Sequence, residues 1–127
     1  MSIRILDVGQ CGFDGPRMEK LWKTELGATV DRVDSADEAA QKLAGGKYDV
    51  VLVNRLLAAD GSSGLKVIER VRGEAPDVPV MLVSDRDDAQ EQAVALGAVR
   101  GFGKAELEDE ATVQLVQEVA AKGGGAS

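Results

Sequence analysis

Few residues of this chain are suited to chemistry, and most of them directly follow an apolar segment. Cys11 and Arg17 are separated by five residues, a spacing that can place a nucleophilic thiolate beside a cation that holds an oxyanion. Ser84 and Lys104 supply a hydroxyl and an ammonium group, which are both suited to contacting the oxygens of an anion. Asn54 ends a run of four apolar residues, but a carboxamide is a poor nucleophile and cannot form an acyl phosphate.

Histidine is absent from the 127 residues, and this one count excludes many kinds of site. Without imidazole there are no histidine metal ligands, no Ser–His or Cys–His nucleophile pairs and no phosphohistidine. The single cysteine rules out an internal disulfide and suits a reducing compartment. We therefore expect a cytoplasmic protein.

Charge and hydropathy narrow the range of partners. The formal net charge is −7, which argues against direct binding to nucleic acid, because phosphate backbones attract basic surfaces. No apolar run approaches the roughly 18 residues that a membrane-spanning helix requires. A strand-like pattern begins at Ile3 and leaves no room for a signal peptide. The sequence therefore predicts a domain that binds neither nucleic acid nor membrane directly.

The elements that position these residues alternate between strand-like and helix-like patterns, and the length suits a single domain. The patterns predict strands over 3–9, 28–33, 49–54, 78–84 and 98–102, and helices over 15–26, about 36–44, 65–73, 89–97 and 107–119. Three of the strands are nearly continuous apolar runs, which is typical of parallel strands covered on both faces. We expect one domain over 1–121 and a flexible, glycine-rich tail over 122–127.

Five strand–helix units with right-handed crossovers predict an α/β fold with a doubly wound, five-stranded parallel sheet. The expected strand order is 2-1-3-4-5, with helices on both faces. In such a sheet, function is found beyond the carboxyl ends of the strands. Those ends carry Gly9–Cys11, Asn54, Ser84 and Lys104, so topology brings these positions together whatever their chemistry.

The chain resembles the receiver domain of bacterial two-component response regulators over about residues 3–120. Ser84 ends a strand where that family has Ser or Thr, and "ALGAVRGFGK" (95–104) is similar to the family's Ala-Gly-Ala…Lys segment, with Lys104 at the matching distance. Asp60 and Gly61 resemble the segment that follows the family's phosphoacceptor. In that family an aspartate of the third strand attacks a phosphoryl donor, carboxylates hold Mg²⁺, and the lysine and hydroxyl contact the phosphoryl oxygens.

This sequence departs from the family pattern at the positions that do the chemistry. The paired acids of the family align with Gly9 and Gln10, and the phosphoacceptor aligns with Asn54. Ser84 and Lys104 are retained, but without carboxylates Mg²⁺ has no protein anchor. We expect Asn54→Asp alone to leave the site inactive, and the further acids Gly9→Asp and Gln10→Asp to improve it.

The signalling parts of the pattern are altered as well. The switch aromatic of the family falls on Gly101, beside Phe102, and the proline that follows the family's lysine is Ala105. The resemblance therefore implies a receiver-like signalling module that acts by protein–protein interaction, without aspartyl phosphorylation. We expect no enzyme activity, no cofactor and no metal, and a signalling protein such as a kinase or another regulator domain as the partner.

An enzymatic alternative rests on Cys11 and Arg17. The Cys-x5-Arg spacing after a first strand is similar to the phosphate-binding loop of low-molecular-weight protein tyrosine phosphatases and arsenate reductases. Asp14 inside that loop would repel an oxyanion, and Pro16 removes one backbone amide that should hold it. Turnover of an aryl phosphate or arsenate would support only this alternative.

Each retained residue also has a purely structural interpretation. Asn54 can be a turn former that bonds local backbone, Ser84 can cap the following helix, and Lys104 can be a solvated lysine. Asp7 lies within a strand that should be buried, where it must find donors or stay protonated. Trp22 could be an exposed residue that anchors a partner, but we expect its neighbours to cover it, as is usual for a single tryptophan on such a helix.

Overall fold

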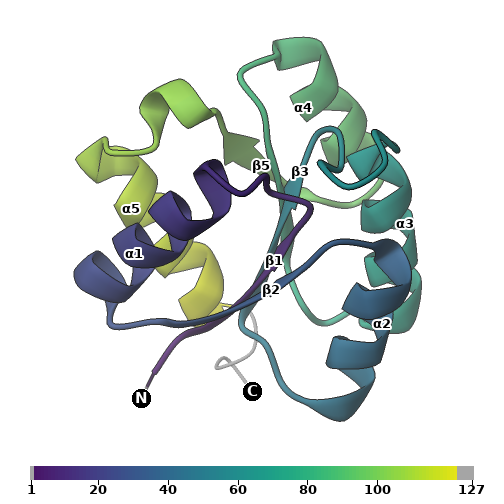
Figure 1. Cartoon of the computed structure of the whole chain (residues 1–127), viewed down its shortest axis with the longest axis horizontal. Helices are drawn as coiled ribbons and strands as arrows, with labels where there is room; N and C mark the ends of the chain where they lie inside the picture. Colours follow the sequence, from purple (N-terminus) through teal and green to yellow (C-terminus); the bar gives the residue numbers. More distant parts are fainter. Residues whose placement is uncertain (1, 123–127) are drawn as a thin grey trace.

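The computed structural model describes residues 2–122, and its centre is a five-stranded parallel sheet with the strand order β2-β1-β3-β4-β5. Helices α1 and α5 cover one face, and α2, α3 and α4 cover the other (Figure 1). The predicted fold class and strand order are therefore confirmed. Among the described residues, no helix combines the length and the apolar character that a membrane crossing requires.

The observed elements agree with the predicted ones apart from their ends. The strands are β1 (Arg4–Val8), β2 (Thr29–Val33), β3 (Val50–Asn54), β4 (Val80–Val83) and β5 (Val99–Phe102). The helices are α1 (Asp14–Leu26), α2 (Ala36–Gly45), α3 (Gly64–Glu74), α4 (Asp87–Ala95), the short 3₁₀ helix η1 (Lys104–Glu106) and α5 (Glu110–Lys122).

Two predicted boundaries need correction. The last helix was expected to begin at Leu107, but η1 occupies the segment before it and α5 begins at Glu110. The predicted tail 122–127 begins one residue too early, because Lys122 is the last residue of α5. Residues 123–127 lie outside the described part of the chain.

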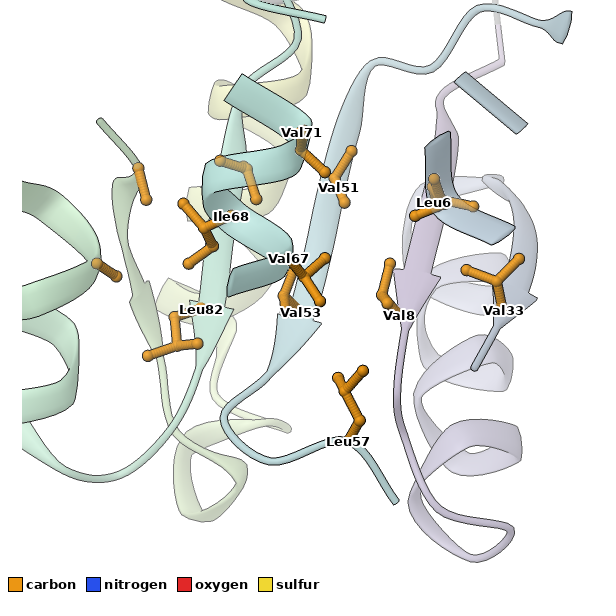
Figure 2. Close-up of a cluster of buried hydrophobic side chains, with 14 of the residues drawn as sticks. Leu6, Val8, Val33, Val51, Val53, Leu57, Val67, Ile68, Val71 and Leu82 are labelled. Atoms are coloured by element: carbon orange, nitrogen blue, oxygen red, sulfur yellow. The ribbon is translucent and has the colours of Figure 1, made fainter. Parts of the chain in front are cut away.

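Alternation along the strands divides the core into two layers. In the layer under α2, α3 and α4, the aliphatic side chains of β1, β3 and β4 meet those of α3, as Figure 2 shows for Val51 beside Val71 and for Val53 beside Val67. The layer under α1 and α5 contains the aromatic residues Trp22 and Phe102. Continuous apolar runs in β3 and β4 are needed because both of their faces are buried.

Local signals explain where two of the helices begin and end. The Ser35 side chain accepts a hydrogen bond from Glu38 N (3.1 Å), and Glu38 Oε1 accepts one from Asp34 N (3.1 Å), which starts α2. Gly27 has a left-handed backbone (φ +62°) and ends α1. Trp22 on α1 is fully buried, with its ring 5.8 Å from that of Phe102, so it is a core residue and no surface anchor.

Candidate functional site

The loops that follow β3, β4 and β5 line an open cavity of about 330 Å³ at the carboxyl edge of the sheet. It is lined by Asn54, Arg55, Leu56, Val83, Ser84, Asp85, Arg86 and Lys104. Three of the predicted site residues, Asn54, Ser84 and Lys104, therefore share one cavity. Gly9, Gln10, Cys11 and Arg17 do not line it.

Asn54 uses its side chain to fasten two loops. Its Nδ2 donates to the carbonyl of Leu56 (2.9 Å) and to the carbonyl of Gly9 (3.1 Å). The Gly9 carbonyl also accepts from Ala58 N (3.0 Å), so the loops after β1 and β3 are joined at one oxygen. Two carbonyl acceptors require an amide nitrogen at this position, which a carboxylate does not have. The turn-forming interpretation of Asn54 is confirmed.

The positions of the family's paired acids have no carboxylate and no room for one at the first position. Gly9 has φ +82°, and a Cβ atom there would overlap the side chain of Leu57. Gln10 is 6% exposed, and within residues 2–122 neither its Oε1 nor its Nε2 has a hydrogen-bond partner. An acid at Gly9 would therefore strain the backbone, which argues against the prediction that Gly9→Asp improves the site.

Lys104 is engaged by Asp14, a residue that the sequence suggested only as an obstacle to oxyanion binding. Lys104 Nζ lies 2.8 Å from Asp14 Oδ2, and both side chains are mostly buried. The hydrogen bond from Lys104 lowers the pKa of Asp14 below its ordinary value, despite some burial, and the Cys11 thiol and Arg17 act in the same direction. The solvated interpretation of Lys104 is wrong, because the ammonium group ties η1 to the start of α1.

Ser84 organises the turn between β4 and α4. Its Oγ accepts from Arg86 N (3.1 Å), and its own backbone N donates to the Phe102 carbonyl (2.8 Å). The N-cap of α4 is Arg86, which makes no side-chain cap hydrogen bond. Ser84 is therefore a turn residue before the helix and does not cap α4, which corrects that interpretation.

A register shift separates β4 from β5 at the place where the family has its switch aromatic. Met81 pairs with Val99, but Val83 pairs with Phe102, so β5 carries one extra residue. At Gly101, one of the two β5 residues between these pairs, a Cβ atom would overlap the Leu82 carbonyl. Phe102 is consequently turned into the layer under α1 and α5.

Gln90 of α4 fills the gap that the register shift leaves. Its Nε2 donates to the carbonyls of Leu82 (2.9 Å) and Ser84 (3.0 Å), and its Oε1 accepts from Gly101 N (2.9 Å). The side chain is 3% exposed, so all three hydrogen bonds are shielded from water. We call this group the Gln90 clamp. It joins α4 to both β4 and β5.

Sequence reasoning missed the Gln90 clamp, although one signal was present. Gln90 lies three residues before Ala93, on the apolar stripe of a helix whose other members are alanine and leucine. A polar residue on such a stripe must be buried with partners. Its partners lie on two strands, and only the tertiary structure identifies them.

Cys11 and Arg17 do not form an oxyanion loop. The segment from Asp14 onward is already the first turn of α1, so no open loop connects the two residues. The Cys11 thiol lies 3.5 Å from Asp14 Oδ2, to which it donates, and its sulfur accepts from Asp14 N (3.3 Å). The Arg17 guanidinium pairs with Glu108 (3.5 Å).

Candidate ligands for a metal ion are scattered over the described part of the chain. Across residues 2–122, no three acidic or sulfur side chains gather in a way that could hold a metal ion. Asp14 is paired with Lys104, and Asp85 Oδ1 accepts from Ala105 N (3.2 Å).

Comparison with known proteins places this geometry in a family. The family model described as the response regulator receiver domain matches residues 16–116. The receiver domain of NtrX from Brucella abortus is 22% identical, with a TM-score of 0.73 over 93% of this chain and 98% of that one. A two-component response regulator from Clostridium difficile is 20% identical, with a TM-score of 0.74 over 93% and 95% of the two chains.

Longer relatives also match in fold. A structure of NtrX from Brucella abortus is 21% identical, with a TM-score of 0.78 over 96% of this chain. The match covers 27% of that protein, so this chain spans about a quarter of its length. No curated protein matches the sequence.

Proposed function

The chain belongs to the response regulator receiver domain family, and we propose that it is a member that signals by protein–protein contact without aspartyl phosphorylation. The observation that carries the proposal is the Asn54 amide, which donates to the carbonyls of Gly9 and Leu56. A phosphoacceptor needs a free carboxylate oxygen at the cavity. Here the equivalent side chain is an amide whose nitrogen already serves as a structural donor.

The counter-charge of Lys104 supports the same proposal. In a phosphorylatable site, the lysine is available to the incoming phosphoryl oxygens. Here Asp14 holds Lys104 Nζ at 2.8 Å, so an incoming phosphoryl group would have to displace a carboxylate. No neighbouring pair of acids would anchor Mg²⁺ to help it, because those positions are Gly9 and Gln10.

The Gln90 clamp supports the proposal that the α4–β5 surface has its binding conformation before any partner arrives. Receiver domains interact with other signalling proteins or domains, and a partner must recognise some surface of this one. Because Gln90 joins α4 to β4 and β5 through three buried hydrogen bonds, the α4–β5 surface is held in one arrangement. We propose that partners bind this fixed form, in the cytoplasm, where the single cysteine stays reduced.

Phosphorylation is tested by incubating the full chain with acetyl phosphate and Mg²⁺ and recording its intact mass. The expected result is no phosphoryl adduct, while a receiver domain that has the strand-3 aspartate, treated in parallel, gains one. An adduct on this chain, whether at Asp14, Asp85 or elsewhere, contradicts the proposal.

Protein contact is tested with this chain before and after treatment with acetyl phosphate. Immobilised chain, untreated or treated with acetyl phosphate, should capture the same partner proteins in the same yield. A partner that binds only after treatment would show that a phosphoryl group, and not the preformed surface, controls recognition. The alternative, an enzyme based on Cys11 and Arg17, predicts turnover of an aryl phosphate. We expect no turnover, because Cys11 contacts Asp14 and Arg17 pairs with Glu108, so the two residues do not act together.

A further inference from the structure

Asp7 is a buried acidic group that the proposed function does not use. It lies in β1, one of the inner strands of the sheet, and is 1% exposed. Within residues 2–122, neither of its carboxyl oxygens has a hydrogen-bond partner. The Gln10 side chain, in the loop that follows β1, is buried and likewise has no hydrogen-bond partner among residues 2–122. An unpaired buried carboxylate is unfavourable unless it is protonated.

The charged side chains around Asp7 come from three different elements. Arg32 is its register partner on β2, and the charge of Lys104, on η1, favours the ionised form of Asp7. From α1, Glu19 adds a second negative charge. On the other side, the register partner on β3 is the apolar Leu52. Asp7 therefore faces two cations and one anion, and it has a strong hydrogen bond with none of them.

Both cations are also the groups that hold the first half of α1. Arg32 pairs with Glu19 (3.8 Å), and a Cβ atom at Gly15 would come within 2.6 Å of its guanidinium group. Lys104 pairs with Asp14, the first residue of α1. A negative charge on Asp7 would compete with Glu19 for Arg32 and with Asp14 for Lys104, because one cation is shared in each case.

We propose that Asp7 is a proton-operated switch beneath α1. With its proton, the carboxyl group is uncharged and leaves the Arg32–Glu19 and Lys104–Asp14 pairs intact. When the proton passes to solvent, the carboxylate draws both cations toward the sheet and loosens the start of α1. The switch does not depend on the phosphorylation state of the domain, so it can fail while the proposed function stands.

The ionisation range supports a switch that works near neutrality. Burial raises the pKa of Asp7 to about 7. The nearby Gln10 amide lowers it by a smaller amount, although it makes no hydrogen bond of good geometry with Asp7, and the charges of Arg32 and Lys104 lower it as well, while Glu19 adds to the increase. The folded state therefore binds the Asp7 proton more tightly than the unfolded chain does. The charged form becomes populated as pH rises through about 7.

Trp22 is a built-in reporter for the test. It is the only tryptophan of the chain, it lies on α1, and it is fully buried. Trp22 fluorescence and backbone hydrogen exchange of α1 are followed in the full chain from pH 5.5 to 8.5. The expected result is one transition near neutral pH. The protection factors of the first turns of α1, which compare each exchange rate with that of an unstructured amide at the same pH, should be at least about tenfold lower at the upper end.

The variant Asp7→Asn should remove the transition, because it keeps the shape and cannot ionise. Asp37→Asn is the matched control, since Asp37 is an exposed carboxylate on α2 that pairs with Arg70. Arg32→Gln and Lys104→Gln should each move the midpoint to higher pH, because each removes a cation that favours the charged form.

Direct titration decides the proposal even if Asp7→Asn fails to fold. The carboxyl carbon of Asp7 in the native chain is followed by NMR across the same pH range. A midpoint near neutrality that coincides with the Trp22 transition supports the switch. A midpoint near 4, a native chain with no transition, or a transition that persists in Asp7→Asn overturns it.

Discussion

Gln90 and Asp7 are buried polar side chains on opposite faces of the sheet: Gln90 belongs to α4, and Asp7 lies in β1 under α1. Gln90 makes three hydrogen bonds to the backbone of β4 and β5. Asp7 makes none within residues 2–122. Both residues are almost completely buried, with Gln90 3% and Asp7 1% exposed. They therefore differ in their hydrogen-bond partners and not in their burial.

This difference assigns different properties to the two faces. A buried amide with all of its partners fixes the elements that it joins, because breaking it exposes several unpaired groups at once. A buried carboxyl group without partners has a state that depends on pH, and the pairs around it depend on that state. We infer that α4 is the rigid side of the domain and that α1 is the side that responds.

The largest expected effect comes from removing the ionisable group. Asp7→Val places an aliphatic residue where the strand pattern calls for one, and it should raise the free energy of unfolding at pH 8 by up to about 4 kcal/mol. The sign follows from the raised pKa of about 7: the native chain loses stability as pH rises from about 4 to about 7 and then levels off. Urea unfolding at several pH values measures both chains, and equal pH profiles would contradict the prediction.

The next largest effect is expected at Gln90, the buried side chain that has all of its hydrogen-bond partners. Gln90→Leu removes three hydrogen bonds and leaves buried backbone groups of Leu82, Ser84 and Gly101 unpaired, which should cost roughly 3 kcal/mol. Gln92→Leu is the matched control, because Gln92 lies on the exposed side of the same helix. Denaturant unfolding gives the difference, and hydrogen exchange at Gly101 should accelerate only in Gln90→Leu. Equal stability of the two variants would show that the clamp contributes nothing.

The sequence predicts the fold of this chain better than it predicts the contacts between its side chains. The strand order follows from apolar runs and right-handed crossovers, and the same topology placed Asn54, Ser84 and Lys104 at one edge. The Lys104–Asp14 pair joins residues 90 positions apart, so no local pattern indicates it.

The remaining differences have physical causes that a sequence pattern does not carry. The segment 98–102 predicted a strand, but the register shift depends on how Gly101 meets the Leu82 carbonyl. The left-handed backbone of Gly9 was equally invisible, since glycine adopts many conformations. For that reason, the acid expected to help at position 9 would instead overlap Leu57.

Asn54 is, like Gln90, an amide side chain with hydrogen-bond partners, and it lines the cavity. Replacing it tests whether the cavity depends on those hydrogen bonds. Asn54→Asp loses two donated hydrogen bonds and places a negative charge against the carbonyls of Gly9 and Leu56, which should cost about 2 kcal/mol at pH 7. The cost should shrink at pH 4, where the protonated acid can donate one bond again. Adding Gly9→Asp should destabilise the chain further. Unfolding at both pH values checks this, and an unchanged stability at pH 7 would contradict it.

The smallest effect concerns the pair that links the cavity to the responsive side. Lys104→Gln removes the ion pair with Asp14, and because the side chains are 30% and 18% exposed, the loss should be about 1 kcal/mol at low salt and less at high salt. The pKa of Asp14 is lowered in the folded state, so this contribution is present at neutral pH and is lost as pH falls below the ordinary range of an aspartate. Lys20→Gln is the control on the exposed surface of α1. Unfolding at low and high salt, near pH 7 and near pH 3, separates the two variants. If Lys104→Gln and Lys20→Gln behave alike under all four conditions, the ion pair does not hold α1, and the cation for which Asp7 is proposed to compete would be Arg32 alone.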